Sequence, residues 1–230
     1  MQERQSANGG ESSVGDSTKV LRASAQPDTP TEAQMRAMGL VDVQELDSTI
    51  LVSLVYATPD NFMGEVLYQD IHKAFLLPQM AEKVVAAQRE LRSEHPELTL
   101  LIWDAARPLS VQKKMFRRVV GTPQQKYVAN PNNGPGMHNF GAAVDITLAD
   151  TLGQPLPMGT PFDHFGKEAN TNREKQLLDE GKITRQEYDN RLLLRRLLKK
   201  QGLRTISSEW WHFNLMDTQE GRRKLKAIEN

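Results

Sequence analysis

The stretch SSEWWHF, Ser207 to Phe213, is the part of the chain around which the rest can be organised. Its central positions, Glu209 to His212, hold a carboxylate, two indoles and an imidazole. A second dense stretch, GMHNFGAAVDITL from Gly136 to Leu148, supplies another histidine and an aspartate. Together they offer three ligands and one general base, which is the inventory of a mononuclear zinc hydrolase. We therefore interpret the remaining sequence as a scaffold for these two stretches.

Composition narrows the classes of protein that fit. The chain has 230 residues, enough for one domain with a real core and a tail. Lys plus Arg and Asp plus Glu both number 29, so no general attraction to nucleic acid or to an acidic membrane is expected. No apolar run is long enough for a transmembrane helix. The absence of cysteine excludes disulfides, thiolate zinc sites and a cysteine nucleophile, so any metal must be held by imidazole and carboxylate.

Residues 1–30 are rich in Ser, Gly, Gln, Asp and Thr and nearly free of large apolar side chains. Such a segment cannot bury enough surface to fold, so we predict a disordered leader or tether ahead of a catalytic domain over 31–230. It lacks the apolar region of an intact signal peptide. One interpretation is an exported protein or lipoprotein, periplasmic or on the cell envelope, with a lipid tether at its native N-terminus. The alternative is a cytoplasmic protein with a polar tail.

The rest of the chain mixes helical and strand patterns without a regular alternation. A capping box of Thr31 with Gln34 predicts a first helix that stops at Gly39. Further helices are expected over 76–94, 110–120, 172–201 (as a hairpin capped by Thr184 and Glu187) and from 218, and strands over 48–57, 98–103, 142–148 and 209–215. This pattern predicts a single α+β domain with a central, mostly antiparallel sheet flanked by helices.

The candidate zinc ligands are His138, Asp145 and His212, for one ion per chain. Asp145 lies inside an apolar strand pattern, where an unpaired carboxylate is costly and a cation removes the cost. His138 precedes it by an odd spacing, which in one continuous strand would put the two side chains on opposite faces. We therefore expect His138 in a bend before the strand, with Gly141 permitting the turn.

Glu209 and His212 present the same parity problem. We expect His212 on the strand and Glu209 at the entry to it, reaching toward the attacking water. Glu209 would then be the general base, with a pKa raised by burial beside Trp210 and Trp211. Either motif alone is a weak signal, but His138, Gly141 and Asp145 combined with a distant ExxH are more specific.

Arg107, at the end of an apolar strand in WDAARP, has two interpretations. A fixed guanidinium there would stabilise the oxyanion of a tetrahedral intermediate. A structural salt bridge with Asp104 explains it as well, and position alone slightly favours that. Among the other histidines, His72 and His95 fit surface positions and His164 fits either a surface or a site.

At these residues the sequence resembles a known family. MHNFGAAVD is similar to the SxHxxGxAxD motif of the D-alanyl-D-alanine metallopeptidases, which are zinc enzymes. EWWHF resembles their closing motif, in the version of the D-Ala-D-Ala dipeptidases of the vancomycin-resistance type. YATPDNFMG, WDAARP and PMGTPFD resemble three further blocks of that subfamily, so the likeness runs over about residues 41–215.

The resemblance implies roles position by position. His138, Asp145 and His212 match zinc ligands, Glu209 the catalytic base and Arg107 the arginine that stabilises the transition state, which reverses the preference for a mere salt bridge. Asp163 matches the carboxylate that binds the free amino group of a dipeptide, and Tyr68 matches an aromatic wall of the pocket.

One position departs from the family. The serine two residues before the first zinc histidine, associated with the substrate's C-terminal carboxylate, is Gly136 here. That change allows a roomier pocket and another dipeptide, with a backbone N–H still available as donor.

The sequence therefore predicts zinc-dependent hydrolysis of short peptides such as D-Ala-D-Ala. The alternatives are a cell-wall D,D-carboxypeptidase or L,D-endopeptidase of the same family, and a non-catalytic, zinc-stabilised peptidoglycan-binding module. An amino-group anchor at Asp163 distinguishes a dipeptidase from a carboxypeptidase, and dispensable Glu209 or Arg107 would indicate the binding module.

Overall fold

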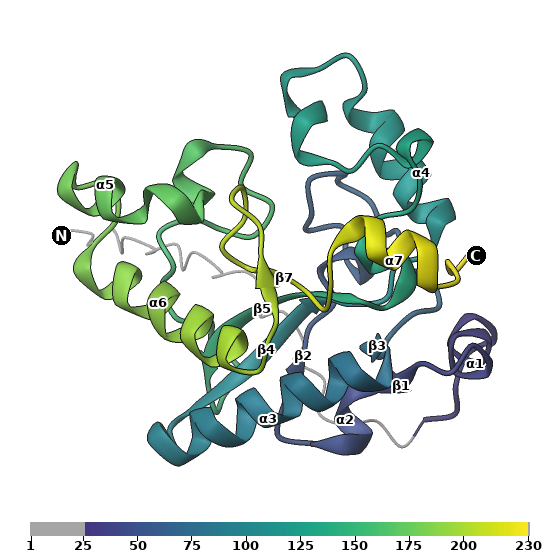
Figure 1. Ribbon diagram of the computed structural model, residues 1–230, viewed down its shortest axis with the longest axis horizontal. Coiled ribbons are helices and arrows are strands. Elements are labelled where there is room, and N and C mark those ends of the chain that lie inside the picture. Colours follow the sequence, from purple (N-terminus) through teal and green to yellow (C-terminus); the bar gives the residue numbers. More distant parts are fainter. Residues whose placement is uncertain (1–25, 230) are drawn as a thin grey trace, which may run out of the picture.

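A five-stranded sheet in the order β2-β4-β5-β7-β6 forms the centre of the computed structural model, which describes residues 26–229 (Figure 1). Only β2 and β4 pair in parallel, and the other neighbours are antiparallel. A second, two-stranded sheet pairs β1 with β3. The strands are β1 Val41–Asp42, β2 Leu51–Val52, β3 Phe75–Leu76, β4 Leu98–Asp104, β5 Ala143–Asp150, β6 Arg204–Thr205 and β7 His212–Asn214.

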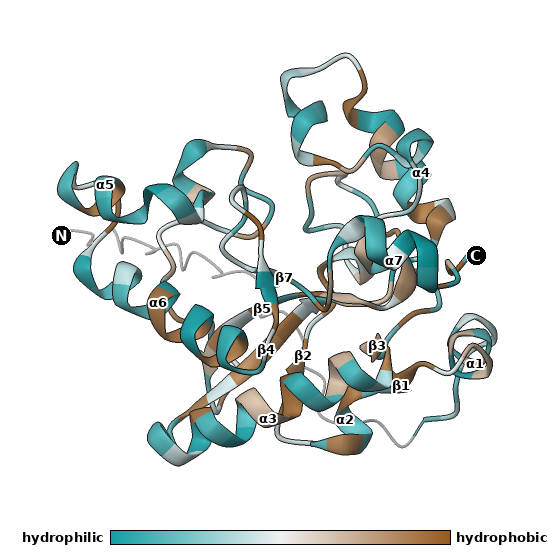
Figure 2. Cartoon of the chain, in the orientation of Figure 1, coloured by the Kyte–Doolittle hydropathy of each residue, from teal (hydrophilic) through white to brown (hydrophobic). Residues whose placement is uncertain are grey.

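Helices flank this sheet, so the prediction of an α+β domain with a mostly antiparallel sheet is confirmed. They are α1 Pro30–Ala37, α2 Val43–Leu46, α3 Pro78–Glu94, α4 Leu109–Val119, α5 Glu174–Asp179, α6 Arg185–Lys200 and α7 Thr218–Lys224. Helix α3 packs against α6 and against β4, and α6 packs against β5. Their outward surfaces are largely hydrophilic, while β4 and β5 are largely hydrophobic (Figure 2). No helix in residues 26–229 has the length and apolar character needed to cross a membrane.

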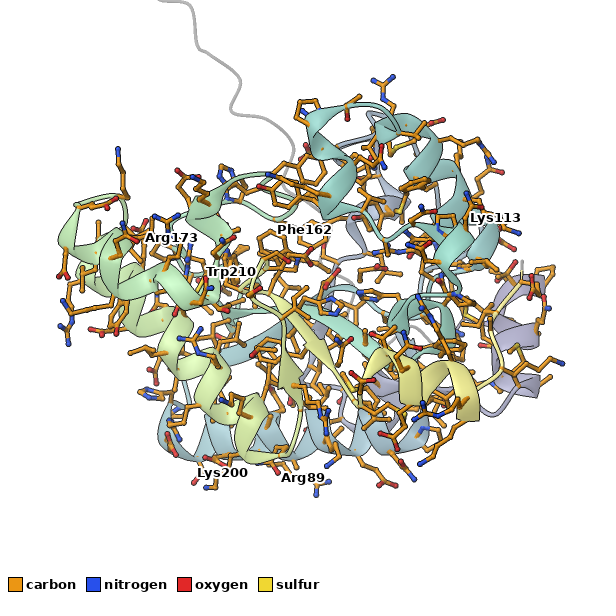
Figure 3. The ribbon with its side chains drawn as sticks, turned by 45° about the horizontal axis from the view of Figure 1, so that its top comes forward. Arg89, Lys113, Phe162, Arg173, Lys200 and Trp210 are labelled. Carbon is orange, nitrogen blue, oxygen red and sulfur yellow. The ribbon has the colours of Figure 1, made fainter. Side chains whose placement is uncertain are left out.

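The apolar side of helix α3 packs against the sheet and forms part of the hydrophobic core. Met80, Val84, Ala87 and Leu91 recur along one stripe of α3 and are all fully buried. Phe162 and Trp210 lie in the middle of the molecule, whereas Lys113 and Lys200, among the other labelled residues, point outward (Figure 3). The buried face of α3 packs against β4, and Phe162 and Trp210 pack against Trp103 of the same strand.

The strand predicted over 48–57 is shorter than its alternating pattern suggested. Only Leu51–Val52 forms a ladder, with β4, and a 3-10 turn, Val55–Ala57, follows. Ile50 and Tyr56, at its two ends, are nevertheless buried. The alternating apolar pattern therefore reflects burial, because these side chains reach the core although the backbone pairs with β4 only at Leu51–Val52. The 209–215 strand is likewise reduced to β7, His212–Asn214.

The first helix is capped by a different pair from the predicted one. Thr29, not Thr31, accepts from the N–H of Glu32, and Glu32 takes the place expected of Gln34 in the capping box. Pro30 then occupies the first helical turn, where its missing N–H costs nothing. The predicted stop at Gly39 is confirmed by its left-handed φ of 89°.

The boundary of the predicted leader also moves. Residues 1–25 lie outside the described part of the chain, and the prediction of disorder there stays a prediction. Residues 26–30, assigned to the leader from composition, contact the domain: Lys73 Nζ lies 2.8 Å from the Gln26 carbonyl and 2.7 Å from Asp28 Oδ1. The predicted helical hairpin is confirmed as α5 and α6, with the Thr184–Glu187 capping box.

Candidate metal centre

The register of the sheet brings two of the three predicted ligands together. Asp145 in β5 is paired directly with His212 in β7 on one side and with Asp104 in β4 on the other. Residues paired across strands project from the same face, so these side chains form one row. A β-bulge between Ile102 and Asp104 adjusts the end of β4 at this point, as bulges next to functional sites often do.

His138 joins the row from outside the strand, as its odd spacing predicted. It lies in a 3-10 turn, Met137–Phe140, and Gly141 follows at a left-handed φ of 65°. A Cβ at Gly141 would come within 2.5 Å of Leu40 Cδ2, so both the turn and the packing need glycine there. His138 is thereby returned to the face of β5 that carries Asp145.

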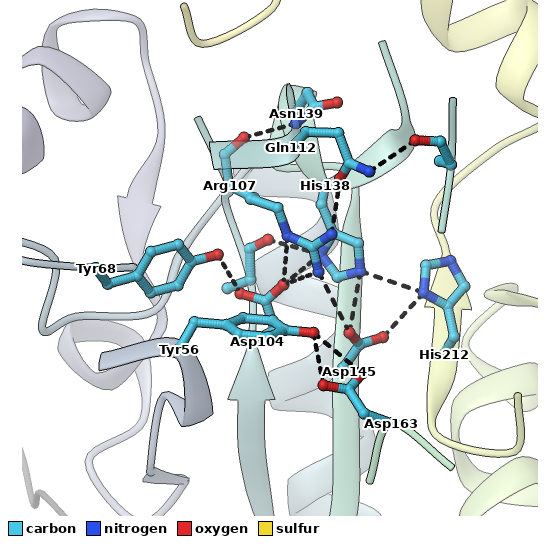
Figure 4. Close-up of polar contacts among 12 residues, drawn as sticks. Tyr56, Tyr68, Asp104, Arg107, Gln112, His138, Asn139, Asp145, Asp163 and His212 are labelled. Carbon is cyan, nitrogen blue, oxygen red and sulfur yellow. Dashed lines mark hydrogen bonds and ion pairs between the residues drawn. The ribbon is translucent and has the colours of Figure 1, made fainter. Parts of the chain in front are cut away.

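The three side chains converge on one point (Figure 4). His138 Nε2 lies 3.3 Å from Asp145 Oδ2 and 3.2 Å from His212 Nδ1, and His212 Nδ1 lies 2.9 Å from Asp145 Oδ1. One ligand atom from each residue lies within 4.8 Å of the others, and all three residues are buried. Segments separated by 74 positions therefore supply one buried donor set, as predicted.

The outer nitrogens of the two imidazoles fix which atoms face this point. His138 Nδ1 lies 2.7 Å from the Ala105 carbonyl, which accepts only, so Nδ1 carries the proton and Nε2 is bare. His212 Nε2 lies 2.8 Å from Asn214 Oδ1, which leaves Nδ1 bare. Two bare nitrogens and a carboxylate oxygen thus face one another, and this hydrogen-bond pattern is typical of metal-binding histidines.

Electrostatics at the centre favour a bound cation. Burial alone would raise the pKa of Asp145, but His138 and His212 hold that pKa well below its usual range. Burial lowers the pKa of His138, and Asp145 and Asp104 outweigh this and raise it. The donor set attracts positive charge, and imidazole with carboxylate suits zinc. These residues therefore fit a zinc ion.

Glu209 lies at the entry to β7, next to the donor set. Its Oε2 is 3.9 Å from His212 Nδ1, and its side chain lines the same cavity. Burial raises the pKa of Glu209 to about 7, against a lowering by His212. The predicted position and the predicted cause of the pKa shift are both found.

Arg107 combines the two interpretations given to it. Its Nε donates to Asp104 Oδ2 at 3.0 Å, a second bond to the same oxygen comes from Nη2, and Nη1 donates to Gln112 Oε1 at 2.8 Å. Its guanidinium also lines the cavity and reaches within 3.9 Å of Asp145 Oδ2. The salt bridge with Asp104 therefore exists, and it fixes Arg107 beside the donor set.

Asp163 faces the cavity from the segment that follows β5. Both of its carboxylate oxygens lie about 3 Å from the Tyr56 hydroxyl, at 3.0 and 2.9 Å, and that hydroxyl donates to them. Asp163 has a left-handed φ of 58°, which is uncommon for a residue with a side chain and frequent at functional sites. Burial raises its pKa to about 7, against a lowering by the Tyr56 hydrogen bond.

Tyr68 is not among the residues that line the cavity, contrary to the expected role as its wall. It is buried behind Tyr56, and its hydroxyl donates to Asp104 Oδ1 at 2.6 Å. Tyr56 takes the place on the wall. It heads the YATPDNFMG block, so the block itself was the signal, and the structure shows which of its tyrosines faces the cavity.

Two more residues of the centre were missed by sequence reasoning. Asn214 follows His212 by two positions, and the period of a strand places both on one face, so parity was an available signal. Asp104 was considered only as a partner of Arg107.

His164, for which the sequence fitted either a surface or a site position, lines the cavity and contacts Glu168 Oε2 at 3.1 Å.

The cavity has a volume of about 230 Å³, below the roughly 300–1,000 Å³ of pockets for drug-sized ligands. Gly136 lies on its wall. Its N–H is not the free donor that was expected, because it donates to Asn139 Oδ1 at 2.8 Å. A Cβ at Gly136 would meet only ordinary contacts at 3.7 Å. Gly136 therefore supplies neither a side chain nor a free N–H to a ligand.

Comparisons with known proteins agree with the motifs. A family model described as D-Ala-D-Ala dipeptidase matches residues 36–229. A D-alanyl-D-alanine dipeptidase of Escherichia coli K12 is 31% identical over 180 residues, 76% of this chain and 84% of that protein. One from Synechocystis is 30% identical over 65% of this chain and 72% of its own, and one from Enterococcus faecium is 27% identical over 78% and 93%.

Proposed function

Because this chain belongs to the D-Ala-D-Ala dipeptidase family and is a metallo-dipeptidase, we propose that it hydrolyses D-Ala-D-Ala or a closely related dipeptide with one bound zinc ion. The observation that carries this proposal is the convergence of His138, Asp145 and His212 in a small cavity that also contains Glu209, Arg107 and Asp163. A zinc ion held by the three ligands would polarise the scissile carbonyl and lower the pKa of a water molecule.

Glu209 is the general base in this mechanism. Its carboxylate takes a proton from the water as that water attacks the carbonyl carbon, and later delivers the proton to the leaving amine. A base works best with a pKa near the working pH, and burial brings the pKa of Glu209 to about 7. The 3.9 Å separation from His212 keeps Glu209 beside the donor set without using it as a ligand.

Arg107 stabilises the oxygen that becomes negative during the attack. Asp104 and Gln112 hold the guanidinium in a fixed orientation, so little reorganisation is needed when the charge develops. Burial would lower the pKa of Arg107, but Asp104, followed by Tyr56 and Tyr68, outweighs burial and holds that pKa well above the usual value, so Arg107 stays charged.

Asp163 binds the substrate's ammonium group and limits the enzyme to short substrates. A carboxylate oriented by Tyr56 and facing the cavity is a suitable partner for a free amino group. A carboxypeptidase acting on longer peptides has no use for such an anchor. The position of Asp163 therefore favours a dipeptidase over the cell-wall carboxypeptidase or endopeptidase alternatives.

The test combines metal analysis with a panel of substrates. We expect one zinc per chain and faster hydrolysis of D-Ala-D-Ala than of its L,D, L,L and longer counterparts. Glu209→Ala should keep the zinc and lose hydrolysis by about 10³-fold or more, since the general base is removed. Retained turnover would remove Glu209 from the base role, and a wild-type protein without zinc or dipeptidase activity would contradict the proposal.

A further inference from the structure

Arg222 is a cation on the wall of the cavity that the mechanism above does not use. It comes from α7, and its half-buried side chain lines the cavity. Its Nε donates to the Pro135 carbonyl at 3.0 Å and its Nη2 to the Gly134 carbonyl at 3.1 Å. A Cβ at Gly134 would come within 3.1 Å of Nε, so the guanidinium packs directly on the backbone. Arg222 is therefore held in a defined orientation.

The charge of Arg222 is not neutralised by a carboxylate. Within residues 26–229 it forms no ion pair, and none of its hydrogen bonds uses Nη1. Arg107, the other arginine on the cavity wall, is by contrast paired with Asp104 and Gln112. Its two carbonyl partners orient Arg222 but carry no net charge, so its positive charge remains available to an anion in the cavity.

The cavity therefore carries opposite charges in two places. Helix α7, which bears Arg222, lies on one side of β7, and the segment from β5 to α5, which bears Asp163, lies on the other (Figure 1). The zinc ligands lie on β5, on β7 and in the turn before β5. A free dipeptide has the same pattern: an ammonium at one end, a carboxylate at the other, and one peptide bond between them.

Gly136, on the cavity wall near Arg222, offers no donor to a ligand. Gly136 has no side chain, and its N–H is used by Asn139. Pro135, which precedes it, accepts from Arg222 Nε, so the guanidinium lies next to the part of the wall that Gly136 lines. Thr218 and Asn214 also line the cavity, but both are neutral. Among the described residues, Arg222 is the one arginine or lysine on the cavity wall that is not paired with a carboxylate, since Arg107 is paired with Asp104.

We propose that Arg222 binds the C-terminal carboxylate of the dipeptide and, with Asp163 at the other end, selects free zwitterionic dipeptides. This inference rests on the proposed dipeptidase function and assigns it a specificity-determining residue. A charge at each end fixes the length of the substrate as well as its polarity, because a longer peptide or a C-terminal amide cannot satisfy both partners.

The experiment compares two substrates in three proteins. Zinc-loaded, full-length wild type, Arg222→Gln and Arg223→Gln are assayed with D-Ala-D-Ala and with D-Ala-D-alaninamide, which lacks the terminal charge. Glutamine keeps an N–H donor for the loop carbonyls but removes the cation. Arg223 is an exposed neighbour on the same helix, so Arg223→Gln matches the change in net charge.

The expected result is a selective loss. Arg222→Gln should raise KM for the free acid by about 10- to 100-fold, the range for losing a hydrogen bond to a charged group, with kcat changed less than about threefold. The amide should be hydrolysed equally by wild type and variant, and Arg223→Gln should behave as wild type. Arg222→Lys should restore part of the affinity, because it keeps the charge without the planar fork.

Three results would overturn the inference. Equal losses on acid and amide would show that Arg222 only supports the loop at Gly134 and Pro135. Equal hydrolysis of acid and amide by wild type would show that the carboxylate is not read at all. Hydrolysis of neither substrate by zinc-loaded wild type would contradict the proposed function itself, and the assignment of Arg222 with it.

Discussion

The two walls of the cavity are built in different ways. The wall that holds the proposed metal ligands is built mainly on paired strands, and the pairing of Asp145 with His212 positions two of the three side chains at once. The wall that carries Asp163 contains no strand: it is the segment between β5 and α5. Backbone hydrogen bonds tie the two ends of that segment, from Leu156 N–H to the Leu148 carbonyl and from Thr171 N–H to the Ser207 carbonyl, and side chains hold the part between them. Arg191 from α6 donates to the carbonyls of Met158 at 2.6 Å and Glu168 at 2.9 Å, on either side of Asp163.

Because of this difference, we expect metal affinity and substrate binding to depend on different residues. A backbone ladder spreads its stability over many hydrogen bonds, so only the ligands and their direct partners should control metal affinity. A loop held by a few side chains depends on each of them, so a residue far from the chemistry can control substrate binding. Mutations on one wall should therefore leave the function of the other intact.

The largest effect is expected at Asp145. Asp145→Ala removes the ligand that bridges the two histidines, and we expect loss of zinc and of all measurable hydrolysis. Thr147→Val is the matched control, two positions along the same strand and the same face. Its hydroxyl is buried and has no hydrogen-bond partner within residues 26–229, so removing it should be neutral or stabilising. Metal content and thermal unfolding measure both variants; zinc retained by Asp145→Ala would contradict the assignment of the centre.

A smaller effect on the same wall is expected at Asn214. Asn214→Ala removes the acceptor for His212 Nε2, so the imidazole is no longer held in the tautomer that leaves Nδ1 bare. Loss of such a partner typically costs about 10- to 100-fold in metal affinity or activity. Zinc affinity measured by competition with a chelator should fall by that factor, while KM at saturating zinc stays near the wild-type value. Unchanged affinity would show that Asn214 does not orient His212.

Arg191→Met should weaken substrate binding and leave zinc affinity unchanged. The carbonyls of Met158 and Glu168 lose their donor, at a cost of about 1–3 kcal/mol in stability, and the segment with Asp163 loosens. Glu174 keeps Arg195 as its partner, so no carboxylate is left unpaired. We expect KM for D-Ala-D-Ala to rise about tenfold with unchanged zinc affinity. Asn190 lies on the same helix as Arg191 and donates one hydrogen bond to the Pro157 carbonyl, so Asn190→Ala is the milder comparison. A variant that loses zinc would break the separation of the two walls.

The smallest effect is a pH dependence of substrate binding. Asp163 has a pKa of about 7, so its carboxylate is mostly charged at pH 8 and mostly protonated at pH 6. The substrate amine, with a pKa of about 8, is roughly half protonated at pH 8 and gains charge as the pH falls, so the charge that is lost is that of Asp163. Because the gain in ammonium partly offsets the loss of the Asp163 carboxylate, KM should rise about fivefold from pH 8 to pH 6. Asp163→Asn should show a high KM that does not rise over this range, and a wild-type KM that does not rise would argue against Asp163 as the amino-group anchor.

The sequence by itself determined the chemistry of the centre. Composition restricted the ligands to imidazole and carboxylate, and strand parity placed His138 in a turn before Asp145 and Glu209 ahead of His212. These are local consequences of backbone geometry, which a short stretch fixes without help from the rest of the chain.

Only the tertiary structure decided which side chains from distant segments meet there. Tyr56 rather than Tyr68 faces Asp163, the Gly136 N–H is already used, and Arg222 lies beside the loop that precedes it. Asp163 and Tyr56 are 107 positions apart, and Arg222 and Pro135 are 87 apart. No local pattern encodes such contacts, because they depend on how strands pair and helices pack over the whole domain.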